Sequence, residues 1–211
     1  MGCPRPYSGV MTSTASQERK AMVSALRSVT ADAPTLCKGW SAQDLALHIV
    51  VRDSRPDLMV GRRLPLVGPK ARAALQNLAS GGYDASVDRV AAGPPPYFPQ
   101  ILKPVDDAMN TLEYYIHTED VLRAQPGFEL SHRREISEEL RKRIWQHASL
   151  TFFVMAARKQ NRRITFFSPG YGATTRGPAA APLMMVHGTP EELTLWASGR
   201  AAHAQVDITE A

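Results

Sequence analysis

The stretch L-E-Y-Y-I-H-T-E-D-V, residues 112 to 121, decides how this chain is expected to fold. It belongs to a predicted helix over residues 104 to 123, which stops before a Pro-Gly pair. Since a helix turns about 100° per residue, its polar side chains share one sector about 80° wide. These are Asp106, Asn110, Glu113, His117 and Asp120. Apolar residues cover the remaining faces, so the helix should be buried and its polar stripe needs partners.

A second helix, predicted from residue 41 to about 61, repeats this design. Ser41 and Asp44 form an S-x-x-D capping signal, and the cap is the favoured role for Asp44. A proline at position 56 predicts a kink or break. The residues that share the polar sector are Asp44, His48, Arg52 and Arg55. Two buried helices with one polar stripe each are expected to turn those stripes toward each other.

The facing stripes predict a metal site. Glu113 and His117 are four residues apart, so both project from one helical face toward a single ion. His48 would supply a third ligand and leave open positions, as in catalytic sites. Imidazole and carboxylate suit zinc first, with nickel, iron or manganese as alternatives. The competing interpretation is that these histidines are hydrogen-bonded core residues. Asp120 would either orient His117 or pair with Arg52 or Arg123.

The rest of the chain divides into a helical part and a shorter mixed part. Further helices are predicted at residues 12 to 29, 69 to 78, after 82, and 137 to 158, with Leu150 on the apolar stripe of the last. Three consecutive prolines predict a loop at residues 93 to 100. From residue 163 onward, short apolar runs between Pro/Gly turns predict two or three strands and one helix. We therefore expect a leader (1–11), a helical bundle (12–160) and a small α+β unit (161–211).

Composition limits the class of protein. The net charge is +5, but basic and acidic residues are interleaved without alternating aromatics, which argues against nucleic-acid binding. No apolar run reaches the roughly 20 residues of a membrane span, and no signal peptide is evident, so a cytoplasmic location is expected. The two cysteines, Cys3 and Cys37, do not make a disulfide framework.

Three motifs resemble one known family. W-S-A-Q-D-L-A-L-H-I (residues 40 to 49) resembles the W-x-x-x-D-L-x-x-H signature of the mycothiol-dependent maleylpyruvate isomerase-like proteins, within the DinB/YfiT-like superfamily. Residues 112 to 121 resemble that family's E-x-x-x-H-x-x-D motif, and residues 188 to 200 resemble its closing G-x-x-x-E-L-x-L-W-x-x-G-R segment. The run after His48 is similar to an uncharacterised actinobacterial branch.

The resemblance implies a mainly α fold, a DinB-like four-helix bundle with a small C-terminal α+β appendage. It implies a divalent metal held by His48, Glu113 and His117, and the thiol cofactor mycothiol, toward which Arg200 is the nearest match to a family arginine. Known isomerases have a longer C-terminal part, which puts isomerase activity itself in question.

The leading functional hypothesis is a metal-dependent, thiol-using transferase or isomerase of a small acidic molecule. Arg52 or Arg55 would receive the substrate carboxylate, and Asp120 would assist the metal ligands. The alternatives are a non-catalytic metal-binding stress or regulatory protein and a metal-dependent hydrolase. We expect a monomer or homodimer with no nucleic-acid or membrane partner.

Overall fold

The computed structural model describes residues 13–55, 58, 68–94 and 103–210, with only the backbone at 103–107. The predicted leader, the predicted break at Pro56 and most of the predicted proline-rich loop lie outside the described residues. No helix of the described part is long and apolar enough to cross a lipid bilayer.

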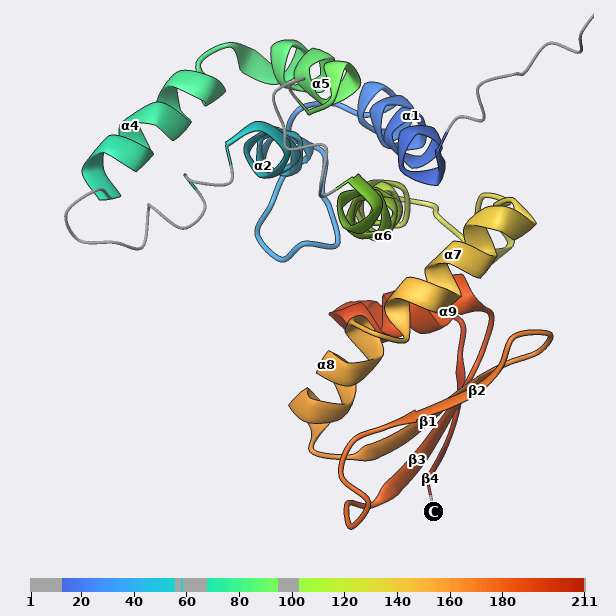
Figure 1. Cartoon of the computed structure of the whole chain (residues 1–211). Coiled ribbons are helices and arrows are strands. Elements are labelled where there is room, and N and C mark those ends of the chain that lie inside the picture. Colours follow the sequence, from blue (N-terminus) through green and yellow to red (C-terminus); the bar gives the residue numbers. More distant parts are fainter. Residues whose placement is uncertain (1–12, 56–57, 59–67, 95–102, 211) are drawn as a thin grey trace, which may run out of the picture.

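Four helices form the first layer of the molecule (Figure 1). They are α1 (Thr14–Arg27), α2 (Ala42–Ser54), α5 (Gly82–Ala92) and α6 (Lys103–Leu122). Apolar side chains from all four meet in one core, which includes Leu26, Ile49, Val87 and Tyr114. α4 (Gly68–Ala79) packs against the outer side of α2 through a smaller cluster. The predicted bundle is confirmed, although the described part of α2 ends at Ser54, before the predicted end near residue 61.

A second core lies between the remaining helices and a sheet. α7 (Glu138–Ala148) and α8 (Phe152–Gln160) replace the single helix predicted at residues 137 to 158. That prediction was wrong because the chain turns at residues 149 to 151, where Leu150 is 71% exposed and does not join an apolar stripe. After the turn, Phe153 of α8 is fully buried and stacks on Phe166, with ring centroids 3.9 Å apart.

The sheet has four strands in the order β2-β1-β3-β4. They are β1 (Arg163–Ser168), β2 (Gly172–Arg176), β3 (Leu183–His187) and β4 (Asp207–Glu210). β1 and β3 are parallel and the other pairs are antiparallel. Successive side chains of a strand point to opposite faces, and along β1 the side chains of Ile164 and Phe166 point to the face that packs on the helices. The predicted C-terminal α+β appendage is confirmed. β2 was not among the two or three predicted strands.

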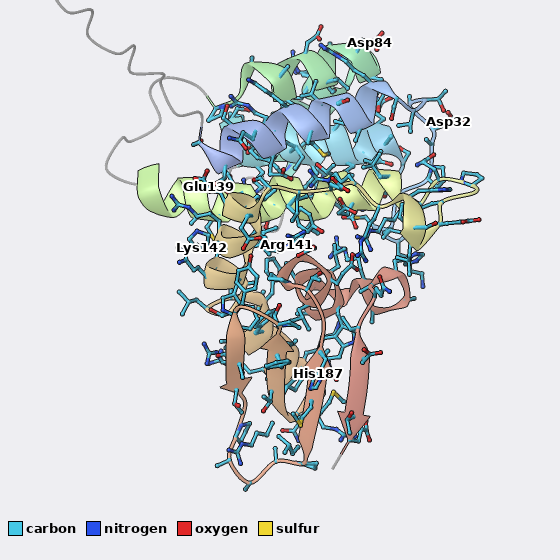
Figure 2. All side chains as sticks on the ribbon, turned by 90° about the vertical axis from the view of Figure 1, so that its right-hand side faces the viewer. Asp32, Asp84, Glu139, Arg141, Lys142 and His187 are labelled. Carbon is cyan, nitrogen blue, oxygen red and sulfur yellow. The ribbon has the colours of Figure 1, made fainter. Side chains whose placement is uncertain are left out.

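In the side view, α6 lies between the other bundle helices and the C-terminal part of the chain (Figure 2), and it contributes side chains to both cores. Tyr114 and Val121 face the first core, whereas Leu112, Tyr115 and Ile116 face the second. α7 and α8 pack with the sheet and α9 (Pro190–Leu195) in that second core, so apolar contacts run across the predicted boundary at residue 160. Whether the two parts are separate domains stays a prediction.

A buried ion-pair network also joins the two halves of the molecule, which are the helical bundle around the first core and the helices and sheet around the second core. Arg123, directly after α6, donates to Glu119 at 2.6 Å and to both carboxylate oxygens of Glu192 in α9, at 2.7 and 2.9 Å. Arg134 bridges Glu119 to Glu18 of α1. Glu119 and Glu192 are each 1% exposed, so each charge depends on its arginine partner.

Candidate functional site

The start of α2 fixes the position of His48. Ser41 Oγ accepts from the backbone N–H of Asp44 at 3.3 Å, while Asp44 Oδ2 accepts from the backbone N–H of Ser41 at 2.9 Å. This reciprocal capping box satisfies two amides at the helix end and confirms the capping role predicted for Asp44. His48 follows one turn later, and its ring lies 5.1 Å from the Trp40 ring, centroid to centroid.

The polar stripes of α2 and α6 do meet. The ring centroids of His48 and His117 are 5.2 Å apart, and Glu113 Oε2 lies 3.5 Å from His117 Nε2. The ligand atoms of His48, Glu113 and His117 all lie within 4.8 Å of one another. The structure therefore brings together the three residues predicted as metal ligands. Their occupation by a metal stays a prediction.

The donor set fits a divalent ion. Zinc ligands lie about 2.0–2.1 Å from the metal, so two of them in a tetrahedral site are roughly 3.4 Å apart. The 3.5 Å between Glu113 Oε2 and His117 Nε2 is close to that value. Two imidazoles and one carboxylate are also a recurrent ligand set for zinc enzymes. Both chemistry and spacing are compatible with one ion at this place.

Asp120 holds His117 from the other side of the ring. Its Oδ2 lies 2.8 Å from His117 Nδ1, and the Asp120 carboxylate is fully buried. Burial alone would lower the pKa of His117, but the hydrogen bond to Asp120, with those to Cys37 and Glu113, raises it to about 10. Burial would raise the pKa of Asp120, but hydrogen bonds from His117 and Arg200 lower it to about 2. An Nδ1–H held by a carboxylate leaves Nε2 directed at Glu113.

Arg200 is the arginine that pairs with Asp120. Its Nε donates to Asp120 Oδ1 at 2.8 Å and its Nη2 donates to Oδ2 at 2.7 Å. Of the two alternatives for Asp120, the pairing with Arg52 or Arg123 is therefore wrong, because both of those guanidinium groups hold other carboxylates. Gly199 has φ = 97°, a left-handed conformation that lets the chain turn after α9 and bring Arg200 back to α6.

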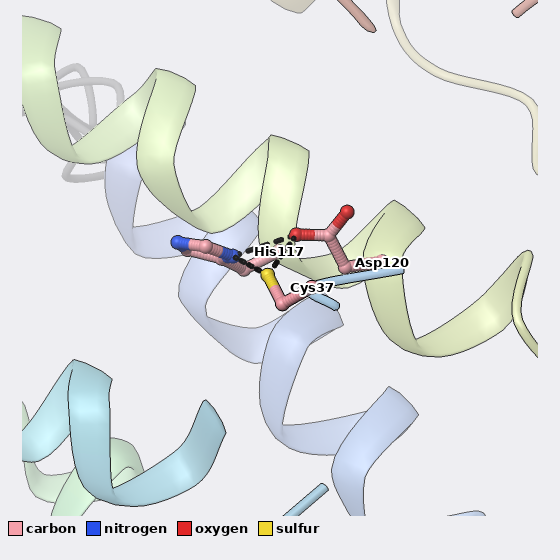
Figure 3. Close-up of side chains that lie close together, drawn as sticks. All are labelled: Cys37, His117 and Asp120. Atoms are coloured by element: carbon pink, nitrogen blue, oxygen red, sulfur yellow. Dashed lines mark hydrogen bonds and ion pairs between the residues drawn. The ribbon is translucent and has the colours of Figure 1, made fainter. Parts of the chain in front are cut away.

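Cys37 is the site residue that sequence reasoning missed. Its Sγ lies 3.2 Å from Asp120 Oδ2 and 3.9 Å from His117 Nδ1 (Figure 3). The same sulfur lies 3.5 Å from Arg200 Nη2. Cys37 lies in the loop between α1 and α2. A hydrogen bond of 3.0 Å from the Leu36 backbone N–H to the carbonyl of Asp120 holds this loop against α6. A single cysteine in a loop carries no spacing pattern, so only its nearness to the Trp40–His48 motif could have drawn attention to it.

The two predicted anion-binding arginines differ in position. Arg52 donates to Asn110 Oδ1 and, at 3.2 Å, to Asp53 Oδ1, and its Nε lies 3.5 Å from Glu113 Oε2. Burial raises the pKa of Glu113, but its hydrogen bond with His117 and the charge of Arg52 outweigh this and lower it. Arg55 is exposed at the C-cap of α2. The structure thus brings Arg52 to the edge of the site, and the catalytic role of each arginine stays a prediction.

A small cavity opens beside His48. It has a volume of about 220 Å³ and is lined by the side chains of Trp40, Asp44, Leu47, His48, Val51, Leu58 and Leu75. Most of this lining is apolar, and the carboxylate of Asp44 is engaged in the capping box. A ligand that reaches the His48 side of the site would therefore rest part of its surface on apolar groups.

Two solved structures resemble this chain. The crystal structure of the mycothiol-dependent maleylpyruvate isomerase matches with a TM-score of 0.59 and 13% sequence identity, over 93% of this chain and 90% of that one. The crystal structure of a histidine-to-alanine mutant of a mycothiol-dependent maleylpyruvate isomerase matches with a TM-score of 0.53 and 15% identity, over 92% and 90%. No family model and no curated protein matches the sequence. At this identity the comparison shows the fold, and the chain has a fold like that of the mycothiol-dependent maleylpyruvate isomerase.

Proposed function

We propose that the chain binds one divalent metal ion through His48, Glu113 and His117, and that it uses the ion to activate a small thiol in a transfer or isomerisation reaction. The observation that carries this proposal is the convergence of the three ligand atoms within 4.8 Å of one another. Zinc is the preferred ion because two imidazoles and a carboxylate suit it. The similarity in fold to a mycothiol-dependent isomerase supports a thiol of the mycothiol type as the partner.

The geometry also favours one of two donor sets that share His117. Cys37, His117 and Asp120 form the second set, whose ligand atoms also lie within 4.8 Å of one another. However, Asp120 already accepts hydrogen bonds from His117 Nδ1 and from Arg200, whereas Nε2 faces Glu113. An ion on the Nε2 side disturbs none of these bonds. Asp120 then orients His117 and makes its ring a stronger donor.

When bound, a divalent ion supplies a Lewis acid that lowers the pKa of a coordinating thiol or water. The chain contributes the surroundings of that chemistry. Arg52 supplies a cation 3.5 Å from the Glu113 carboxylate, where an acidic substrate group would be attracted. The cavity beside His48 would hold the less polar part of a ligand and keep water away from it.

Metal content and cobalt spectroscopy test the first half of the proposal. Protein purified without added metal should contain one equivalent, and Co²⁺ substitution should give d–d bands that disappear in His48→Ala, Glu113→Gln and His117→Ala. His132→Ala, which changes an exposed histidine, is the matched control. Full Co²⁺ binding by the His48→Ala and His117→Ala variants would overturn the assignment.

Thiol binding tests the second half. In a Cys3→Ser/Cys37→Ser background, addition of mycothiol to the Co²⁺ protein should produce a sulfur-to-cobalt charge-transfer band, because both cysteines of the chain are then replaced and the ligand supplies the thiol. An unchanged spectrum at saturating thiol would remove the thiol-using function and leave metal binding intact. Ester or amide hydrolysis without thiol would instead indicate the metal-dependent hydrolase.

A further inference from the structure

Cys37, His117 and Asp120 form a second donor set on the opposite side of the shared imidazole (Figure 3). Cys37 Sγ lies 3.2 Å from Asp120 Oδ2, and Asp120 Oδ2 lies 2.8 Å from His117 Nδ1. Thiolate, imidazole and carboxylate bind Zn²⁺ and Co²⁺, and the thiolate also attracts softer ions such as Cd²⁺. This face of His117 therefore has the composition of a metal site in its own right.

The guanidinium group of Arg200 contacts this second donor set. Arg200 Nη2 lies 2.7 Å from Asp120 Oδ2 and 3.5 Å from Cys37 Sγ, so one nitrogen contacts two of the three donors. Its Nε engages the other carboxylate oxygen of Asp120 at 2.8 Å. These N–H groups use the lone pairs that a cation would need, and their positive charge repels a divalent ion in a buried place.

We propose that Arg200 excludes metal from the Cys37 face of His117 and so confines the ion to the face shared with His48 and Glu113. This inference rests on the metal binding proposed above. Its consequence is that the chain itself supplies only nitrogen and oxygen ligands, although the sulfur of Cys37 is 3.9 Å from His117 Nδ1. Arg200 acts here as a specificity-determining residue for the metal, and removing it should create a thiolate-containing site.

Cobalt spectra of four proteins test this inference. The wild type should bind Co²⁺ without a sulfur-to-cobalt charge-transfer band. Arg200→Met should gain that band, and Arg200→Met/Cys37→Ser should lose it again. Arg200→Lys is the matched control, since it keeps a cation next to Asp120 and should resemble the wild type. The inference is overturned by a charge-transfer band in the wild type, or by its absence from Arg200→Met that still binds Co²⁺.

A measurement on protein with Arg200 in place covers the case in which Arg200→Met does not fold. In a Cys3→Ser background Cys37 is the single thiol of the chain. One equivalent of Zn²⁺ should leave its rate of reaction with a thiol reagent unchanged, because the ion is bound on the other face. A rate that falls severalfold would overturn the inference. Failure of the wild type to bind Co²⁺ or Zn²⁺ would instead refute the proposed function.

Discussion

His117 and Asp120, one turn apart on α6, are joined by a hydrogen bond of 2.8 Å between Nδ1 and Oδ2. Removing the negative charge of this carboxylate should weaken the imidazole as a ligand without removing it. We therefore expect Asp120→Asn to lower metal affinity on the order of 10- to 100-fold while stoichiometry stays the same. Competition with a chromophoric chelator measures this. Asp88→Asn, at an exposed aspartate, is the control, and equal affinities would contradict the orienting role.

The raised pKa of His117 makes the stability of the metal-free protein depend on pH. Its folded-state pKa is about 10, against an ordinary value of 6.5, so the folded protein holds this proton more tightly than the unfolded chain does. The resulting stabilisation is fully present below about pH 6.5 and is lost as pH rises toward about 10. Chemical denaturation of the metal-free protein between about pH 6.5 and 10 should show that the free energy of unfolding decreases as pH rises.

His117→Gln provides the comparison for this pH dependence. The difference in unfolding free energy between wild type and variant should shrink steadily from about pH 6.5 to about 10. A constant difference would mean that His117 does not carry the extra proton in the folded protein. The experiment needs a strong chelator throughout, because a bound ion competes with that proton.

Arg52 gives a test of the anion-binding role against a structural one. Its guanidinium contacts Asp53, whose side chain is 6% exposed, so Arg52→Met removes the cation in contact with a buried carboxylate and leaves the charge of Arg19. We expect a loss of about 3 kcal/mol in unfolding free energy from this change. Arg143→Met removes the same charge from an exposed position on α7 and should cost little.

Carboxylate-ligand binding by Arg52→Met then separates the two roles. If Arg52 also receives substrate, the variant that stays folded should retain its metal and bind small carboxylates more weakly. Isothermal titration with metal and with a small carboxylate, below the melting temperature of the variant, measures the two affinities. Unchanged carboxylate binding would leave Arg52 with a structural role alone.

The Arg123 network should be far more sensitive than a surface ion pair. Arg123→Met leaves the buried Glu192 carboxylate without its arginine and leaves Glu119 with Arg134 alone, so we expect a loss of about 3–5 kcal/mol. Arg27→Met breaks an exposed pair with Asp88, with side chains 59% and 71% exposed, and should cost about 0–1 kcal/mol. Urea denaturation of the two variants provides the comparison. Equal losses would show that the buried network is not what joins the two halves.

Local sequence signals accounted for much of the fold and for the three converging residues. The capping box at Ser41 set the start of α2, and the helical period placed Glu113 and His117 on one face. Both signals act within a few residues, which is why they can be seen in the sequence. The turn near Leu150 could not, because the helical pattern continues across it and the reorientation depends on packing against the sheet.

The parts of the site that residue spacing alone did not indicate depend on long-range contacts. Cys37 approaches His117 through a loop whose backbone is bound to α6, 84 positions further along the chain. Arg200 reaches Asp120 only after the C-terminal half has packed onto α6 and the chain has turned at Gly199. No local pattern encodes such distances, and for Arg200 only the family resemblance pointed to the site.

Because α6 belongs to both cores, the two halves of the molecule depend on each other for stability. Neither half can lose its packing without exposing one side of this helix and breaking the Arg123 network that crosses it. The two halves should therefore unfold together in a single cooperative transition. The central amides of α6 should exchange their hydrogens with solvent at the rate of global unfolding. This exchange should be slower than that of the amides of α4, which packs against the edge of the bundle through a small apolar cluster.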